Sequence, residues 1–90
     1  MTAIAESKWF LYIVRCNDSS LFTGITTDID RRLNEHNFTK KGAKYTRARR
    51  PVNLVYCAHY NNRSSASRAE CKIKKLSRSE KEKMIKIKES

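Results

Sequence analysis

The feature that most constrains the fold is the run of residues 9–16 (WFLYIVRC), in which aromatic and β-branched side chains predominate. Such a composition is typical of a β-strand. Residues 17–20 (NDSS) follow, and their short polar side chains can hydrogen-bond the nearby backbone in a turn. The next residues, 21–26 (LFTGIT), predict a second strand. Together these segments predict an antiparallel hairpin.

A helix is expected after the hairpin. Thr27 or Asp28 can cap its start, and it runs through about Asn37. Ile29 and Leu33 are four residues apart and would share its buried side. Residues 38–51 (FTKKGAKYTRARRP) show little periodicity and predict a basic connection.

Alternation over residues 52–60 (VNLVYCAHY) predicts a third strand, with Val55 and Cys57 on one face and Leu54 and Tyr56 on the other. From Ser64 the apolar residues follow a helical period and form one stripe, which consists of Ala66, Ala69, Ile73 and Leu76.

Ser77 and Glu80 fit a capping box that opens a last helix, with Met84, Ile85 and Ile87 directed inward. The predicted order is β-β-α-β-α-α. This order favours an α+β domain in which helices flank a three-stranded antiparallel sheet.

The 90 residues allow one domain, residues 1–90, with short flexible ends. No apolar run approaches the roughly 20 residues of a membrane span. Glu6 precedes any apolar stretch, so the N-terminus is not typical of a secretory signal. We therefore expect a cytoplasmic protein. The three cysteines lack metal-binding spacing and are expected to be buried free thiols; they are Cys16, Cys57 and Cys71.

The net charge of +11, from 20 Lys and Arg against nine Asp and Glu, indicates a polyanionic partner. Nucleic acid is favoured over a lysine-rich surface that only confers solubility, because arginines cluster at positions 31, 32, 47, 49 and 50. Membrane-surface binding is a weaker interpretation, since no segment combines a broad apolar face with a basic one.

Glu70 interrupts the apolar stripe of the helix after the third strand, because it lies four residues after Ala66 and three before Ile73. A carboxylate placed beside a buried stripe must be paired, hydrogen-bonded or bound to a cation. Two interpretations stay open. Glu70 forms an ion pair with a nearby lysine or arginine, or it serves a metal or catalytic site.

Arg32 and His36 are spaced i, i+4 and share one helix face. Arginine suits bidentate contact with phosphate, and histidine can move protons near neutral pH; a solvated helix face is the alternative. Tyr12 lies in the middle of the first strand, on the face of Phe10 and Val14. Gly24 lies inside the second strand, where glycine often marks a close approach of backbone or ligand.

The ordered spacing of these residues resembles the GIY-YIG nuclease domain. The matching elements are Leu11-Tyr12-Ile13, then Phe22-Thr23-Gly24, then Arg32, His36 and the lone glutamate at position 70. The resemblance covers residues 8–84 and is strongest to the small stand-alone single-domain members, the UPF0213-like group. Their G-I-T-T-D-x-x-R-R-x-x-E-H-N segment matches residues 24–37.

This resemblance implies metal-dependent hydrolysis of DNA phosphodiester bonds, in a bacterial protein. We expect the protein to be a monomer. Glu70 matches the carboxylate that holds one divalent ion, Mg²⁺ or Mn²⁺, and Tyr12 matches the tyrosine that helps to activate water. Arg32 would hold the scissile phosphate, and His36 would relay a proton to or from the tyrosine. The expected catalytic set is therefore Tyr12, Arg32, His36 and Glu70.

Backbone contacts with DNA, or with RNA as a second candidate, are expected from Gly24 and from the basic connection at Lys44, Tyr45, Arg47, Arg49 and Arg50. Tyr45 could stack on a base or pack a loop, and both readings stay open. Asn61 and Asn62 suit either substrate orientation or turn formation.

Phe22 departs from the family pattern, in which a tyrosine occupies this position. Loss of one positioned hydroxyl can lower a rate on the order of 10²-fold. Thr23 supplies a hydroxyl next door, but alternation directs it to the opposite face. The alternative function is therefore a catalytically silent nucleic-acid-binding module. A third hypothesis, an adaptor that docks on another protein, requires an exposed apolar patch.

Overall fold

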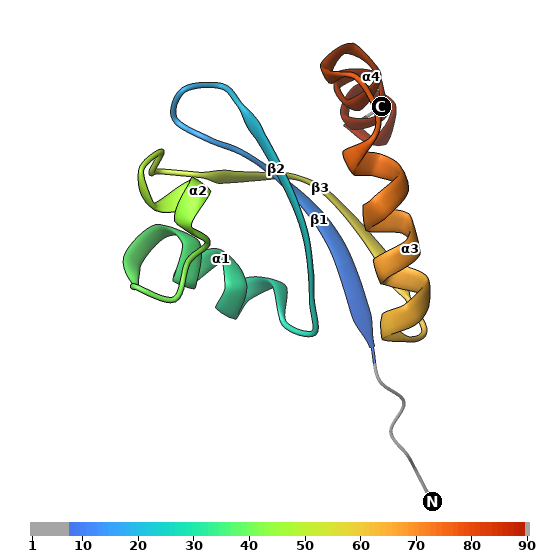
Figure 1. The fold of residues 1–90 in the computed structure, drawn as a ribbon, viewed down its shortest axis with the longest axis horizontal. Helices are drawn as coiled ribbons and strands as arrows, with labels where there is room; N and C mark the ends of the chain where they lie inside the picture. Colours follow the sequence, from blue (N-terminus) through green and yellow to red (C-terminus); the bar gives the residue numbers. More distant parts are fainter. Residues whose placement is uncertain (1–7, 90) are drawn as a thin grey trace, which may run out of the picture.

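A computed structural model describes residues 8–89. Residues 1–7 and residue 90 lie outside this range. The expectations of a flexible N-terminus and of a non-secretory N-terminus therefore fall outside the described residues. The elements follow the order β1 (Trp9–Arg15), β2 (Leu21–Thr26), α1 (Ile29–Phe38), α2 (Lys44–Arg47), β3 (Asn53–Tyr60), α3 (Arg63–Lys74) and α4 (Arg78–Glu89) (Figure 1). The predicted α+β order is confirmed, with one short helix added.

The three strands form an antiparallel sheet in the order β2-β1-β3. Figure 1 shows α1 and α2 on one side of this sheet and α3 and α4 on the other. Tyr12 lies on the central strand, opposite Gly24 on β2 and Cys57 on β3. The catalytic candidate of β1 is therefore held by neighbours on both sides.

Alternation along β1 divides the interior into two apolar clusters. Leu11 and Ile13 pack against Ile73 of α3 and Ile85 of α4. On the opposite face, the second cluster contains Tyr12, Val14, Cys16 and Val52, with Phe22, Ile29 and Leu33 packed against it. The predicted placement of Tyr12 on the face of Val14 is confirmed, as is the inward stripe of α3.

The predicted alternation of β3 is wrong at its first half. The pairing of β1 with β3 shifts between Ile13 and Val14, so that Ile13 faces Tyr56 but Val14 faces Leu54. Val55 is the extra residue of this β-bulge. One extra residue in a strand moves the side chains of the residues before it to the opposite face of the sheet. Leu54 consequently shares the face of Cys57, and not that of Tyr56.

The predicted N-terminal caps of α1 and α4 are confirmed. Asp28 caps α1 by accepting a hydrogen bond from the Arg31 amide at 3.0 Å. Ser77 and Glu80 form the predicted capping box, in which the Glu80 carboxylate accepts from the Ser77 amide at 2.9 Å and the Ser77 hydroxyl accepts from the Glu80 amide at 3.1 Å. Polar side chains therefore satisfy the free amides at both starts.

The basic connection contains the four-residue helix α2, which is too short to show a period. Two smaller expectations are wrong. Ile87 is 75% exposed, so only Met84 and Ile85 turn inward from α4. Among the cysteines, Cys16 is buried, Cys57 is half-buried and Cys71 is exposed on the outer side of α3. None of the described helices is long and apolar enough to cross a membrane.

Candidate active site

A chain of buried polar side chains begins at Tyr12. The Tyr12 hydroxyl lies 2.8 Å from Nε2 of His36, and Nδ1 of His36 lies 2.7 Å from the Thr46 hydroxyl oxygen. The Thr46 hydroxyl donates its own hydrogen to the Ala43 carbonyl at 3.0 Å. Thr46 must therefore accept from Nδ1–H, which leaves Nε2 as the acceptor for Tyr12. The chain joins β1 to α1 and α2.

Burial dominates the protonation of this chain. His36 is 0% exposed, and burial, assisted by the positive charge of Arg32, lowers its pKa to about 4. Burial also raises the pKa of Tyr12 above its ordinary value, although the guanidinium of Arg32 opposes that rise. At neutral pH the resting site therefore holds a neutral imidazole and a protonated phenol.

Arg32 presents a charged guanidinium beside Tyr12. Its Nη1 donates to the Glu35 carboxylate at 2.8 Å and to the Lys41 carbonyl at 2.9 Å. Burial works against the arginine charge, but hydrogen bonds with Glu35 and Tyr12 outweigh it and leave the Arg32 pKa above its ordinary value. The same hydrogen bond from Arg32 lowers the pKa of the Glu35 carboxyl. The guanidinium is thus fixed and permanently charged.

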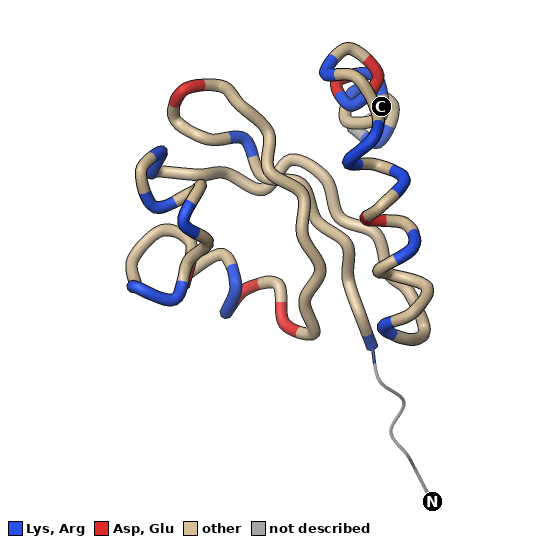
Figure 2. The backbone as a smooth tube through the Cα atoms, viewed as in Figure 1, with Lys and Arg blue, Asp and Glu red and all other residues tan. Residues whose placement is uncertain are grey.

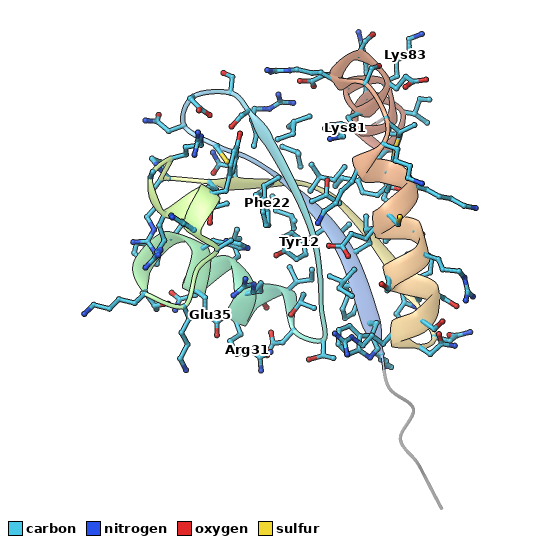
Figure 3. The ribbon with its side chains drawn as sticks, viewed as in Figure 1. Tyr12, Phe22, Arg31, Glu35, Lys81 and Lys83 are labelled. Carbon is cyan, nitrogen blue, oxygen red and sulfur yellow. The ribbon has the colours of Figure 1, made fainter. Side chains whose placement is uncertain are left out.

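Arg31, the neighbouring residue, differs from Arg32 although both belong to α1. Its side chain is 58% exposed, against 26% for Arg32, and its Nε lies 3.8 Å from Glu35. Figure 3 shows Arg31 and Glu35 at the outer side of α1, whereas Tyr12 and Phe22 lie between this helix and the sheet. Arg31 therefore offers a matched control for charge.

Gly24 leaves the space that the Tyr12 ring occupies. A Cβ atom at this position would lie 2.5 Å from the Tyr12 hydroxyl oxygen and 2.7 Å from its Cζ. No side chain fits there without displacing the phenol. Gly24 therefore allows the Tyr12 side chain of β1 to pack closely against the backbone of β2.

Phe22 and Tyr45 form the aromatic border of the site. The Phe22 ring meets the His36 ring edge-on, with centroids 5.4 Å apart, and stacks on Tyr45 at 6.0 Å. The Arg49 guanidinium carbon lies 3.8 Å from the centre of the Tyr45 ring. Tyr45, which is 39% exposed, therefore packs between β2 and the Arg49 side chain.

Glu70 belongs to α3, on the other side of the sheet from α1. Its side chain is 21% exposed, and its Oε2 lies 3.2 Å from Nζ of Lys74. This contact is the ion pair that was one of the two interpretations of Glu70 from the sequence. The negative charge of Glu70 is one of the smaller influences that raise the Tyr12 pKa. Within residues 8–89, no cluster of three His, Cys, Asp or Glu side chains could hold a metal.

The basic connection divides into exposed and engaged side chains. Lys44 and Arg47 of α2 are exposed. Arg50 donates to backbone carbonyls of Glu35, His36 and Thr39 and so closes the end of α1. Figure 2 shows basic positions along α1 and α2 and again along α3 and α4, on both sides of the sheet.

Two residues of the site were not expected from the sequence. Thr46 fixes the His36 ring, and Glu35 anchors Arg32. Glu35 lies three residues after Arg32, a spacing that predicts an ion pair on a helix. Thr46 carries no comparable signal, because it reaches His36 from a separate short helix.

Comparison with known proteins places these residues in a family context. The sequence model described as the GIY-YIG catalytic domain matches residues 8–83. UPF0213 protein DP2720 of Desulfotalea psychrophila is 54% identical over 81 residues, which are 90% of this chain and 74% of that protein. UPF0213 protein SH2523 of Staphylococcus haemolyticus is 51% identical over 79 residues, 88% of this chain and 95% of that protein.

Two solved structures share the fold. The solution NMR structure of UPF0213 protein BH0048 from Bacillus halodurans matches with a TM-score of 0.60 and 43% identity, over 90% of this chain and 85% of that one. The solution NMR structure of protein EF2693 from E. faecalis gives a TM-score of 0.61 and 39% identity, over 92% and 90% of the two chains.

Proposed function

Because the chain belongs to the GIY-YIG family, we propose that it is a metal-dependent endonuclease that hydrolyses phosphodiester bonds in DNA. The observation that carries the proposal is the junction of Tyr12, His36 and Arg32 at one place, with Glu70 close enough to influence Tyr12. These are the four residues whose types and order match the family pattern. A phenol, an imidazole, a guanidinium and a carboxylate together suit phosphoryl chemistry.

Arg32 is the residue proposed to bind the scissile phosphate. Its guanidinium is anchored on one side by Glu35 and the Lys41 carbonyl, which use a single nitrogen, Nη1. Apart from the hydrogen bond with Tyr12, the remaining N–H groups are proposed to bind a phosphate oxygen in the fork geometry that arginine favours. Because the guanidinium is already positioned, it can stabilise charge that develops on phosphorus without reorganising.

Tyr12 is proposed to accept a proton from the attacking water while it passes its own proton to Nε2 of His36. The hydrogen bond of 2.8 Å supports this direction of transfer. A phenol with a raised pKa is a poor base at pH 7, so it needs an acceptor of this kind. The charge of a bound phosphate would favour the imidazolium that His36 forms only transiently.

A divalent metal fits the donor set at Glu70. One carboxylate oxygen is a hard ligand of the kind Mg²⁺ and Mn²⁺ accept, and Mg²⁺ at phosphate sites commonly has one or two carboxylates with water and phosphate as further ligands. Such an ion would act as a Lewis acid toward the phosphate oxygens. Glu70 would exchange its contact with Lys74 for this ligation, at little cost because the pair is partly exposed.

Lys44 and Arg47 are proposed to contact the DNA backbone outside the reacting phosphate. Both are exposed on α2, which contacts α1 through the hydrogen bond between Thr46 and His36. Contacts of this kind are independent of sequence and weaken as salt increases. The proposed enzyme is therefore weakly sequence-specific or selective for DNA structure.

A nicking assay tests this proposal. Supercoiled plasmid and branched duplexes would be incubated with the protein in Mg²⁺, Mn²⁺ or EDTA. Metal-dependent cleavage is expected, and Arg32→Ala should abolish it while Arg31→Ala retains it, since only Arg32 reaches Tyr12. Cleavage that persists in EDTA, or equal activity of the two variants, would contradict the proposal.

A second function is favoured by Phe22. Its ring contacts His36 where the family has a tyrosine, so a hydroxyl is missing beside the imidazole. The alternative is a catalytically silent module that binds nucleic acid through its positive charge. It predicts a salt-sensitive gel shift on the same duplexes without nicking, and a clean metal-dependent nick would exclude it.

A further inference from the structure

A groove runs along the edge strand β2. It is lined by Leu21, Phe22, Thr23, Tyr45, Lys74 and Lys81, and its volume is about 260 Å³. We call it the β2 groove. An adjoining hollow shares three of these residues and extends to Ser20 and Arg78. The volume lies below the roughly 300–1,000 Å³ of pockets for drug-sized ligands, so the groove has room for a fragment of a strand and not for a duplex.

One end of the β2 groove adjoins the candidate metal ligand. Lys74 lines the groove, and its Nζ lies 3.2 Å from the Glu70 carboxylate. A strand whose scissile phosphate lies at Glu70 would therefore enter the groove with its next nucleotide. Lys74 therefore joins the groove to Glu70, and Phe22 and Tyr45 join it to the aromatic border of the site.

Lys81 gives the groove a second positive charge from α4. Its side chain is half-buried, and it forms no ion pair with any residue that the structure describes. Figure 3 shows Lys81 on the side of α4 toward the sheet, whereas Lys83 lies at the outer side of the same helix. A half-buried lysine without a carboxylate partner favours an anion.

Thr23 and two aromatic residues contribute to the lining of the groove. The Thr23 hydroxyl is the only buried side-chain polar atom of the described residues that has no hydrogen-bond partner. From the other face of β2, the stacked rings of Phe22 and Tyr45 add an apolar wall to the groove, with an interplanar angle of 21°. A hydroxyl donor, two ammonium groups and an aromatic wall suit a phosphate joined to a sugar.

We propose that the β2 groove binds the nucleotide adjacent to the scissile phosphate, with its phosphate between Lys74 and Lys81 and its sugar against Phe22 and Tyr45. This proposal rests on the proposed nuclease function, since it assigns part of the same substrate. It gives Phe22 a role as a wall of the strand path. Its substrate class is single-stranded DNA, such as a flap or the strand at a branch.

Binding in the absence of metal tests the proposal without requiring turnover. A short fluorescein-labelled single-stranded DNA oligonucleotide would be titrated with the unaltered protein, Lys81→Ala and Lys83→Ala in EDTA, by fluorescence anisotropy over a range of salt. Both substitutions remove one positive charge from α4. Lys81→Ala should weaken binding about tenfold, and the slope of log affinity against log salt should decrease by about 0.7. Lys83→Ala should change affinity less than about twofold.

The outcomes separate this proposal from the nuclease function. Equal effects of Lys81→Ala and Lys83→Ala would overturn the groove, even if the protein nicks DNA in Mg²⁺. The absence of saturable binding by the unaltered protein would overturn it as well. A selective loss in Lys81→Ala would support the groove, including in a protein that proves unable to cleave.

Discussion

The hydroxyl of Tyr12 lies 2.8 Å from Nε2 of His36, across the boundary between the central strand and α1. Thr46 holds the other ring nitrogen and in turn donates to the Ala43 carbonyl. The hydrogen bonds therefore have one direction, from Tyr12 to His36 and from His36 to Thr46. This direction leaves Tyr12 with a proton acceptor and is the structural basis for assigning it a role in moving a proton.

Thr46→Val tests whether Thr46 positions the His36 ring. Valine keeps the shape of the side chain but leaves the buried Nδ1–H without an acceptor, so the free energy of unfolding should decrease by about 1–3 kcal/mol. NMR chemical shifts of the His36 ring nitrogens should show that the Nδ1–H tautomer is no longer dominant. Thr46→Ser keeps the hydroxyl and should retain the unaltered shifts. Unchanged shifts in Thr46→Val would contradict the positioning role.

The pH dependence of stability tests the burial of neutral His36. Burial lowers the folded-state pKa to about 4, below the ordinary value of 6.5, so the unfolded chain binds more protons between these values. This contribution to stability is present in full above pH 6.5 and is lost as the pH falls toward about 4, by up to about 3 kcal/mol.

Urea unfolding across this pH range should show that decrease, and His36→Leu should remove it. A second acid-sensitive contribution lies lower, because the Arg15 hydrogen bond lowers the pKa of Glu82 to about 2. That contribution is lost only as the pH falls from 4.5 toward 2. Equal slopes for His36→Leu and the unaltered protein above pH 4.5 would contradict the assignment.

Gly24→Ala should destabilise the fold by about 1–3 kcal/mol, because the new Cβ would lie 2.5 Å from the Tyr12 hydroxyl. Because this loss of stability comes from the contact with Tyr12, a double-mutant cycle of Gly24 and Tyr12 isolates it. In a Tyr12→Ala background the same change should cost far less, as measured by urea unfolding. An equal cost in both backgrounds would show that Tyr12 is not the obstacle.

Phe22→Tyr should raise nicking activity if the missing hydroxyl limits the rate. The Phe22 ring already contacts His36 and Tyr45, so tyrosine can occupy the same place. By analogy with one positioned donor, the gain should be on the order of 10²-fold. Phe22→Leu, which adds no hydroxyl, serves as the control. No gain in Phe22→Tyr would show that the hydroxyl is not what limits the rate.

Much of the fold could be predicted because its signals are local. The turn between β1 and β2, the Asp28 cap and the capping box of Ser77 and Glu80 each depend on a few adjacent residues. Leu54 was placed on the wrong face because a bulge is a property of the strand pair, and the sequence of β3 alone does not reveal it. Ile87 was misplaced because α4 packs by Met84 and Ile85 only.

The i, i+4 spacing of Arg32 and His36 predicted that they share one helix face, and their catalytic roles stay predictions. Thr46 could not be predicted, because its role depends on how α2 is placed against α1. The alternative that Glu70 forms an ion pair with a lysine is confirmed by Lys74. Its role as a metal ligand stays a prediction.

The most direct test of the central claim is the metal dependence of plasmid nicking by Glu70→Gln beside Asp30→Asn. Both changes neutralise one carboxylate on a helix, but Asp30 is exposed at the start of α1. In Mg²⁺, the unaltered protein and Asp30→Asn should nick supercoiled plasmid, and EDTA should stop the nicking by both. Glu70→Gln should show only background nicking in Mg²⁺. Nicking by Glu70→Gln at the unaltered rate in Mg²⁺ would contradict the assignment of Glu70 to the metal.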